Sequence, residues 1–277
     1  MFIYRQWDTF CKNLNDCDIH SIPAYSVLKD NKKIPFLVLK HDVETDPHKA
    51  LRLALIEYKY NQKGVYYVQT YLMKSSKNIE IFKKIQSLGN EVSYHHDVMD
   101  STKGNIEAGI IEFQKNIELF SRNGFEIKTV CQHGNPVVER VGYNSNRDFF
   151  RNESIAQRYA DISEIMVNYK YRVGIQYSYI SDVGFGWKII YDPENNDIIP
   201  SEDKNIALGD LNSVFEFVKK GNSIIISTHP HRWYSSAFCA YLKDKIFILI
   251  KIIAKLMMKI PFMKKLMSRY YYLAKKI

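Results

Sequence analysis

Histidine and carboxylate side chains gather in four short clusters along this chain. The clusters are His-Asp-Val-Glu at 41–44, His-His-Asp at 95–97, His-Gly-Asn at 133–135 and His-Pro-His at 229–231. Imidazoles and carboxylates bind divalent metals and exchange protons near neutral pH. If the fold brings the four clusters together, they form a polar site that can hold a metal ion.

Asp42 and Glu44 stand two residues apart, so at the end of a strand their side chains point to the same side. Two carboxylates in one pocket repel each other unless a cation lies between them, or one binds a metal while the other acts as a base. The alternative is a helix cap and a surface salt bridge. The neighbouring His41 and the apolar run before it favour a functional site.

Adjacent histidines on a strand point to opposite faces, so of His95 and His96 only one can face a shared metal, and we expect it to be His95. A pair of structural histidines is the alternative. His133 precedes Gly134, which lets the backbone approach a ligand closely, although a plain turn histidine has the same pattern. Histidine together with carboxylate is a usual ligand set for zinc and related metals.

His229 directly follows an isoleucine-rich run, and Pro230 restricts the backbone behind it. A buried, hydrogen-bonded core histidine is the alternative interpretation. His231, Arg232 and Trp233 crowd the same segment, and an aromatic ring beside basic groups suits contact with a sugar.

The clusters follow runs that are typical of buried strands, at 35–40, 91–94, 127–131 and 223–227. A further strand is expected at 65–68, with others near 175–179 and 188–191, and helices at 4–14, 47–58, 79–88, 105–122 and 211–220. This alternation predicts βαβ units and a parallel sheet. In a parallel barrel the carboxyl ends of the strands meet on one face, so the clusters are expected to converge there.

Composition limits the classes of protein that fit. The 277 residues are 46% hydrophobic and 25% charged, which suits one large α/β domain, with or without an appendage. The net charge of +9 comes largely from the residues after Lys219, so no nucleic-acid partner is expected. The four cysteines lack CxxC spacing and predict reduced, buried thiols. No signal-peptide pattern is found, so we expect a cytoplasmic location, which includes the inner face of the membrane.

Residues 241–277 differ from the rest and predict a basic amphipathic helical tail. Lys251, Lys255 and Lys259 are four apart among apolar residues, and Pro261 interrupts the pattern. One interpretation is a helix that covers the barrel wall. The other is an interfacial helix on an anionic membrane surface. The lysines interrupt every apolar run well short of the ~20 residues that a transmembrane helix needs.

The order of the motifs resembles the polysaccharide deacetylase superfamily (carbohydrate esterase family 4), in particular a divergent branch associated with bacterial surface-polysaccharide biosynthesis. The motifs are His-Asp-Val-Glu, Gly-Asn-Glu-Val-Ser-Tyr-His-His-Asp, His-Gly-Asn-Pro, Ser-Asp-Val-Gly-Phe-Gly-Trp and Ser-Thr-His-Pro-His-Arg-Trp, over residues 34–233. The resemblance implies a distorted (β/α) barrel at 1–240 with a C-terminal helical extension. It also implies a metal-dependent hydrolase that removes an acetyl group from a sugar of a surface polysaccharide or lipid-linked glycan precursor.

The resemblance assigns roles residue by residue. Asp42 is the general base, Glu44 and His95 are metal ligands, and His229 is the general acid. Asp182 and Trp187 match an Asp/Trp element that flanks this acid. The implied metal is zinc, with cobalt or nickel as alternatives. Further side chains expected to contact the sugar are His96, Asn135, Trp187, His231, Arg232 and Trp233.

Three departures from the family pattern matter. Met99 stands where the family has its second metal-binding histidine, and among the possible replacements, which are His96, Asp97, Asp100 and His133, we favour His133. The family's Arg-Pro element is absent, with residues 133–136 in its place. Glu44 replaces a shorter aspartate. These departures leave a second hypothesis open, a catalytically degenerate carbohydrate-binding or scaffold protein held at the membrane by its tail. Retention of Asp42 and His229 favours the enzyme.

Overall fold

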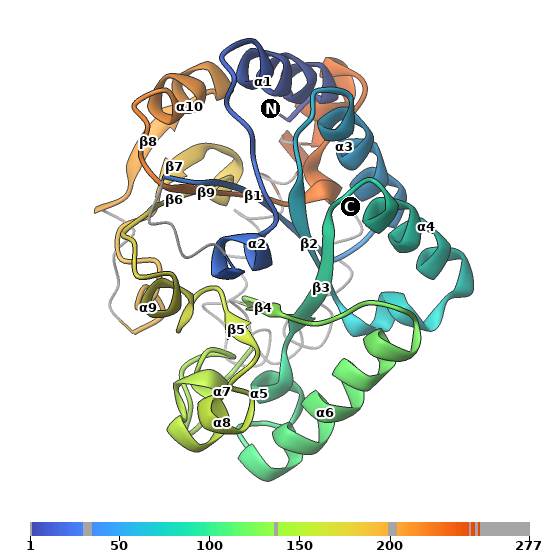
Figure 1. Ribbon diagram of the computed structural model, residues 1–277, viewed down its shortest axis with the longest axis vertical. Helices are drawn as coiled ribbons and strands as arrows, with labels where there is room; N and C mark the ends of the chain where they lie inside the picture. Colours follow the sequence, from blue (N-terminus) through green and yellow to red (C-terminus); the bar gives the residue numbers. More distant parts are fainter. Residues whose placement is uncertain are drawn as a thin grey trace.

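The chain folds around one sheet with helices packed mainly on its outside (Figure 1). The computed structural model describes residues 2–29, 35–135, 138–198, 204–243, 245, 246 and 249. The nine strands within these residues are β1 (Leu37–Val43), β2 (Gly64–Val68), β3 (Glu91–His96), β4 (Thr129–Gln132), β5 (Ser163–Glu164), β6 (Ser178–Ser181), β7 (Trp187–Ile189), β8 (Ile206–Gly209) and β9 (Ile224–Thr228).

The strand order is β5-β4-β3-β2-β1-β9-β6-β7-β8. All neighbours from β5 to β6 pair in parallel, as the sequence predicts for the strands that carry the clusters. The last two strands differ, because β7 runs antiparallel to both β6 and β8. The expectation of a wholly parallel sheet is therefore corrected to a mixed α/β sheet with β5 and β8 at its two ends.

The helices follow the predicted alternation, and several short ones were not expected from the sequence. They are α1 (Tyr4–Asp16), α2 (Ala24–Lys29), α3 (Pro47–Lys59), α4 (Ser76–Ser87), α5 (Val98–Ser101), α6 (Ile106–Arg122), α7 (Asp148–Arg151), α8 (Glu153–Arg158), α9 (Tyr169–Val173) and α10 (Leu211–Val218), with 3-10 turns η1 (Thr70–Lys74), η2 (Val183–Phe185) and η4 (Pro230–Arg232).

Helix α2 lies on the inner side of the curved sheet, whereas α1, α3, α4, α6 and α10 lie outside it (Figure 1). Its Ala24 and Val27 are buried against Val38, Val65 and Ile225, which point inward from three strands. Two other hydrophobic clusters fill the space between the sheet and the outer helices. The apolar packing around α2 therefore closes the interior below the carboxyl ends of the strands.

Strand β1 is longer than predicted, since His41, Asp42 and Val43 belong to it. These residues pair with Tyr66, Tyr67 and Val68 of β2, and His41 also pairs with Thr228 of β9. Neighbours on both sides keep the backbone extended although the side chains are polar. The chain then turns at Asp46, whose carboxylate accepts a hydrogen bond from the Lys49 amide at 3.4 Å, with Pro47 in the first helical turn, as predicted for this helix start.

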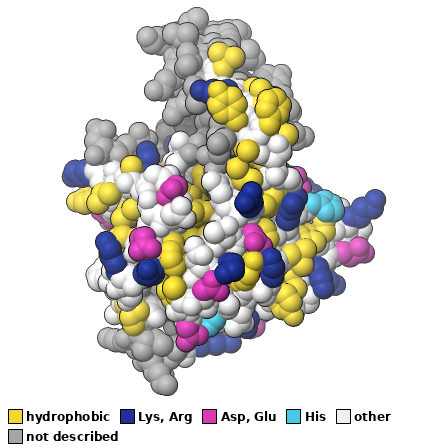
Figure 2. Space-filling view, turned by 90° about the horizontal axis from the view of Figure 1, so that it is seen from above, with side chains coloured by type: hydrophobic (Ala, Val, Ile, Leu, Met, Phe, Trp, Pro, Cys, Tyr) yellow, Lys and Arg dark blue, Asp and Glu magenta, His cyan; other side chains and the backbone are white. Residues whose placement is uncertain are grey.

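The predicted tail at 241–277 lies mostly outside the described residues. Exposed hydrophobic side chains lie just before this region, at Phe238, and at its beginning, at Tyr241, Leu242 and Leu249. Within the part of the chain that the structure describes, no helix is long and apolar enough to cross a membrane. On the face drawn in Figure 2, basic, acidic and hydrophobic side chains are interspersed.

All four cysteines are free, as expected. The expectation that all are buried holds for Cys11 and Cys131, whereas Cys17 and Cys239 are exposed.

Candidate active site and metal centre

The carboxyl ends of β1, β3, β4 and β9 bring most of the predicted residues into one cluster. Alternation along β1 points Lys40 and Asp42 to the inner face, the face of Val38, and His41 to the outer one. His95 and Cys131 lie on adjacent strands, because β3 and β4 pair them directly. The parallel register therefore sets side chains that are far apart in sequence side by side.

The structure brings Glu44, His95 and His133 together. Glu44 Oε1 lies 3.2 Å from His133 Nε2 and 4.0 Å from His95 Nε2. One ligand atom from each of the three lies within 4.8 Å of the others, and all three side chains are buried. Two imidazole nitrogens and one carboxylate form a donor set that suits zinc and similar divalent metals. The arrangement fits the ligand roles expected from the sequence.

A backbone contact orients the His95 imidazole, and two hydrogen bonds hold the main chain of His133. His95 Nδ1 lies 3.0 Å from the carbonyl oxygen of Cys131. A carbonyl can only accept, so Nδ1 carries the hydrogen and the Nε2 lone pair faces Glu44. Burial lowers the pKa of His95 to about 3, which keeps the ring neutral and able to bind a metal. The His133 carbonyl accepts from Asn146 Nδ2 at 2.7 Å, and its amide donates to the His96 carbonyl at 2.7 Å.

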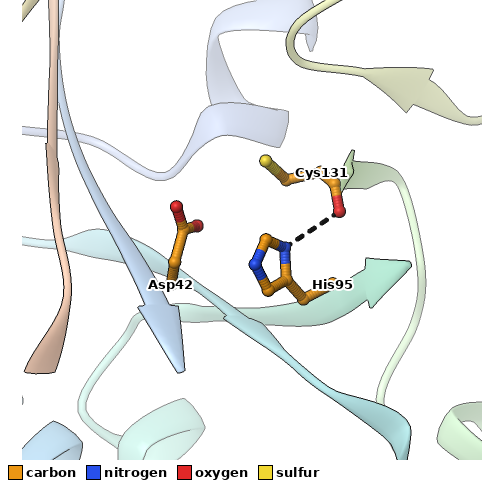
Figure 3. A group of neighbouring side chains, drawn as sticks. All are labelled: Asp42, His95 and Cys131. Atoms are coloured by element: carbon orange, nitrogen blue, oxygen red, sulfur yellow. Dashed lines mark hydrogen bonds between the residues drawn. The ribbon is translucent and has the colours of Figure 1, made fainter. Parts of the chain in front are cut away.

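A second possible donor group consists of Asp42, His95 and Cys131, which converge in Figure 3. Here the ammonium group of Lys40 already lies 2.6 and 2.5 Å from the two Asp42 oxygens. Burial raises the pKa of the Cys131 thiol well above its usual value, so the sulfur stays protonated. Because a metal ligand must be deprotonated, Glu44, His95 and His133 are the better metal centre.

Lys40 is a member of the site that sequence reasoning missed, because it ends an otherwise apolar run. It is almost fully buried and also donates to Ser227 Oγ at 3.2 Å. Burial by itself would raise the pKa of Asp42, but the charge of Lys40 lowers it. The available signal was the alternation of the strand, which puts residues 40 and 42 on one face.

Asp182 follows β6 and holds His229. Its Oδ1 lies 2.8 Å from His229 Nδ1, and its Oδ2 accepts from the His229 amide at 2.9 Å and from Thr228 Oγ1 at 2.8 Å. Burial would raise the pKa of Asp182, but the charges of Arg232 and His229 lower it well below its ordinary range. An ionised Asp182 fixes Nδ1 as a donor and stabilises a protonated imidazole, whose Nε2 lies 3.9 Å from Asp42 Oδ2.

Several predicted sugar contacts lie elsewhere in the structure. His96 is fully buried on the outer side of the sheet, among Tyr94, Phe113, Phe149 and Phe150, so we remove it from the proposed sugar contacts. Adjacent residues of a strand face opposite sides, and the inner side belongs to His95.

The two tryptophans expected to contact the sugar also lie elsewhere. Trp187 and Trp233 are buried in the core, both against Phe2, and Trp233 Nε1 donates to Thr228 Oγ1 at 2.9 Å. Their rings therefore support the strand ends and offer no open face to a sugar. Arg232 donates to Asp182 Oδ1 at 2.7 Å and acts as a positioning group. Asn135 and His231 are only partly buried and remain candidates for substrate contact.

Two further residues have structural surroundings. Met99 is buried in the same hydrophobic cluster as Phe113, so its thioether fills the core and does not face Glu44. His41 Nε2 lies 2.8 Å from Glu57 Oε1, a carboxylate that also accepts from Trp7 Nε1 and the Tyr66 hydroxyl. His41 thus ties β1 to α1 and α3 on the side opposite Asp42.

The chain was compared with family models, curated proteins and solved structures. No family model and no curated protein matches it. Among solved structures it is similar to a CE4 family pseudoenzyme from Bacillus anthracis, with 14% identity, a TM-score of 0.41, and coverage of 72% of this chain and 70% of that one.

Two peptidoglycan deacetylases are also similar. For the Bacillus subtilis protein the identity is 12%, the TM-score 0.32, and the coverage 70% of this chain and 88% of that one. For the Bdellovibrio bacteriovorus protein the values are 13%, 0.30, 79% and 57%. TM-scores below 0.5 support no further inference, so function is argued from the site itself.

Proposed function

We propose that the protein is a metal-dependent hydrolase that removes an acetyl group from a sugar of a surface-polysaccharide or lipid-linked glycan precursor. The observation that carries the proposal is the convergence of the buried Glu44, His95 and His133 beside Asp42 and the Asp182-bound His229. This gives a metal-ligand set, a carboxylate base and an oriented imidazole in one place, as acyl hydrolysis requires.

The chain's own residues have separate tasks in this mechanism. A divalent metal held by Glu44, His95 and His133 would polarise the acyl carbonyl and acidify a water molecule. Asp42, kept ionised by Lys40, accepts a proton from the attacking water. His229 keeps one hydrogen on Nδ1 for Asp182 and, when protonated, donates the hydrogen on Nε2 to the leaving amine or alcohol. Arg232 holds Asp182 in place.

The second hypothesis is a non-catalytic carbohydrate-binding protein on the same fold. The bond between Lys40 and Asp42 is the observation that favours it, because a carboxylate with a lowered pKa is a weaker base. A bound metal would then orient a sugar without leading to hydrolysis. The two hypotheses share the metal centre and differ only in acetate release.

Metal analysis combined with an acetate-release assay tests the proposal. We expect one zinc, cobalt or nickel ion per wild-type chain, and loss of most of it in His95→Ala and His133→Ala. The matched control is His20→Ala, whose imidazole lies outside the site next to Asp18. Asp42→Asn should keep the metal and lose acetate release from an acetylated amino-sugar oligomer. A wild-type protein that binds none of these metals overturns the proposal, and a metal-loaded protein without acetate release supports the second hypothesis.

Three further expectations belong to this proposal, which are the closed shape of the barrel, contact with a membrane and the cellular location. A distorted (β/α) barrel is supported by the parallel run of strands and the enclosed α2. Contact with an anionic membrane surface is supported by the lysine spacing in the tail and by the exposed apolar side chains at 238–249. A cytoplasmic location, which includes the inner face of the membrane, is consistent with a substrate that is a lipid-linked precursor.

A further inference from the structure

A hollow lies at the start of α3, between this helix and the segment after β9. It has a volume of about 230 Å³. Three basic residues, His48, Lys49 and Arg52, line it together with the hydroxyl-bearing Tyr4, Tyr234 and Ser235. None of these residues takes part in the proposed acyl hydrolysis.

The cations of this hollow have no carboxylate partner among the described residues. Neither Lys49 nor Arg52 makes an ion pair there, and the acidic group that acts on both Lys49 and Tyr4 is the exposed Asp46 that caps α3. Lys49 is partly buried, and both its burial and the charge of Lys243 lower its pKa. Since removal of a charge from water is costly unless an opposite charge compensates it, the partly buried Lys49, with the exposed Arg52 in the same hollow, favours an anionic ligand.

Neutral partners hold both cationic groups in place. Lys49 Nζ lies 3.9 Å from the centre of the Tyr234 ring and donates to the carbonyl of His231 at 2.7 Å. The Arg52 guanidinium carbon lies 4.2 Å from the centre of the Tyr4 ring, and its NH1 donates to Ser235 Oγ at 2.6 Å. Four of the five guanidinium N–H donors remain for a ligand among the described residues. The site is therefore ordered before an anion arrives, which reduces the entropic cost of binding.

One hydrogen bond joins the hollow to the segment that carries His229. The Lys49 ammonium binds the main chain of His231, whose ring lies 5.6 Å from that of His229. The planes of the two rings meet at 69°, and both residues lie on the segment that carries the proposed general acid. An anion bound between Lys49 and Arg52 would therefore lie beside the segment that carries His229.

We infer that this hollow binds the phosphate group of a phosphate-bearing ligand. Arginine and lysine together suit a phosphate, because the planar guanidinium bonds two of its oxygens while the ammonium acts as a point charge. If the proposed function holds, on which this step rests, the substrate is an acetylated sugar that carries a phosphate, such as a sugar phosphate or a lipid-linked sugar, and not a neutral polymer.

Phosphate binding can be measured without any assumption about hydrolysis. Calorimetric titration of the full chain with inorganic phosphate should show saturable binding. Arg52→Gln should weaken it about tenfold or more, because a hydrogen bond to a charged group is lost. The matched control is Arg122→Gln on α6, whose guanidinium is exposed and bonds Glu118. No saturable binding, or equal affinities for wild type and Arg52→Gln, would overturn the inference.

Two further arms separate the source of the phosphate from the proposed hydrolysis. The first arm measures binding to phosphatidylglycerol vesicles. If Arg52→Gln no longer binds them and Arg122→Gln still does, a lipid headgroup is the source of the phosphate. A higher KM of Arg52→Gln for an acetylated sugar phosphate, with an unchanged KM for the neutral acetylated sugar, would identify the substrate. If phosphate binding depends on Arg52 but neither sugar releases acetate, the two proposals are separated. The anion site is then supported, and the hydrolase proposal is refuted.

Discussion

The ammonium group of Lys40 lies 2.6 and 2.5 Å from the two oxygens of Asp42, with both side chains buried at the end of β1. The proposed base therefore has its own counter-ion inside the fold. This pair also explains why Asp42 is a poorer metal ligand than Glu44, since its charge is already compensated.

The Lys40–Asp42 pair predicts a coupled loss of stability. Lys40→Met should lower the free energy of unfolding by about 3–5 kcal/mol at pH 7, because it leaves a carboxylate buried without its partner. The double variant with Asp42→Asn should recover part of this loss. Since the pKa of Asp42 is lowered in the folded state, the effect is complete above its ordinary value near 4 and declines as the pH falls below it. Urea unfolding of wild type, Lys40→Met, Asp42→Asn and the double variant measures the coupling. If the two single losses of unfolding free energy add up to the loss in the double variant, the coupling is contradicted.

The bond between Asp182 and His229 predicts a catalytic effect. In Asp182→Asn the amide can donate to Nδ1 and no longer stabilises a protonated imidazole, so kcat for acetate release should fall about 10²–10⁴-fold with little change in KM. Asp197→Asn makes the same chemical change in a carboxylate that bonds Arg147 and Arg151 outside the site, and should leave kcat unchanged. Steady-state kinetics of both variants decide, and an unchanged kcat in Asp182→Asn would exclude His229 as the acid.

Glu91 predicts a pH-dependent stability. Burial raises its pKa to about 7, although Thr129 Oγ1 and the Tyr25 amide donate to its oxygens. A raised carboxyl pKa means that the carboxyl group stays protonated to a higher pH in the folded state than in the unfolded state. The stability contribution of Glu91 is therefore present near pH 4.5 and lost as the pH rises to 7, by about 3 kcal/mol. Other buried groups titrate in the same range, so the comparison that isolates Glu91 is wild type against Glu91→Gln.

For Glu91 the measurement is urea unfolding at pH 5 and pH 8. From pH 5 to pH 8, the free energy of unfolding of Glu91→Gln should rise by about 3 kcal/mol relative to that of wild type, because the variant has no proton to lose at this position. A constant difference between the two proteins across this range would show that Glu91 has an ordinary pKa in the folded state.

The basic tail predicts binding to anionic membranes. Each basic residue near an anionic surface contributes roughly 1 kcal/mol, so the triple change of Lys251, Lys255 and Lys259 to Gln should weaken vesicle binding about 10²-fold. The control changes Lys77, Lys83 and Lys84 to Gln, exposed lysines of α4, and has the same net charge. Cosedimentation with phosphatidylglycerol vesicles measures both. Equal binding of the two triple variants would mean that net charge, and not the tail, attracts the membrane.

Local patterns in the sequence were enough to predict most of the elements that carry the site. The strands before residues 41, 95, 133 and 229 and the helix that starts at Pro47 follow from apolar runs, caps and turn residues, which act over a few neighbours. The convergence of their ends follows from parallel pairing. The strands expected near 175–179 and 188–191 overlap β6 and β7, but the antiparallel pairing of β7 was not predicted. The short α2, β5 and β8 were also not predicted, because their residues have no strong period and are held by tertiary packing.

The sequence by itself determined which residue types stand at the ends of the strands, and therefore the kind of chemistry that is possible there. Only the tertiary structure decided which of them meet. His95 and His96 are identical residues at adjacent positions, yet one faces Glu44 and the other the Phe113 core. From the sequence alone, Lys40 is the end of a hydrophobic strand, whereas in the fold it bonds Asp42. Trp233 is likewise a predicted sugar contact, whereas in the fold it packs on Phe2. The physical reason is that residue type follows from local sequence, whereas the partners of a buried side chain depend on strand register and on distant segments that fill the space around it.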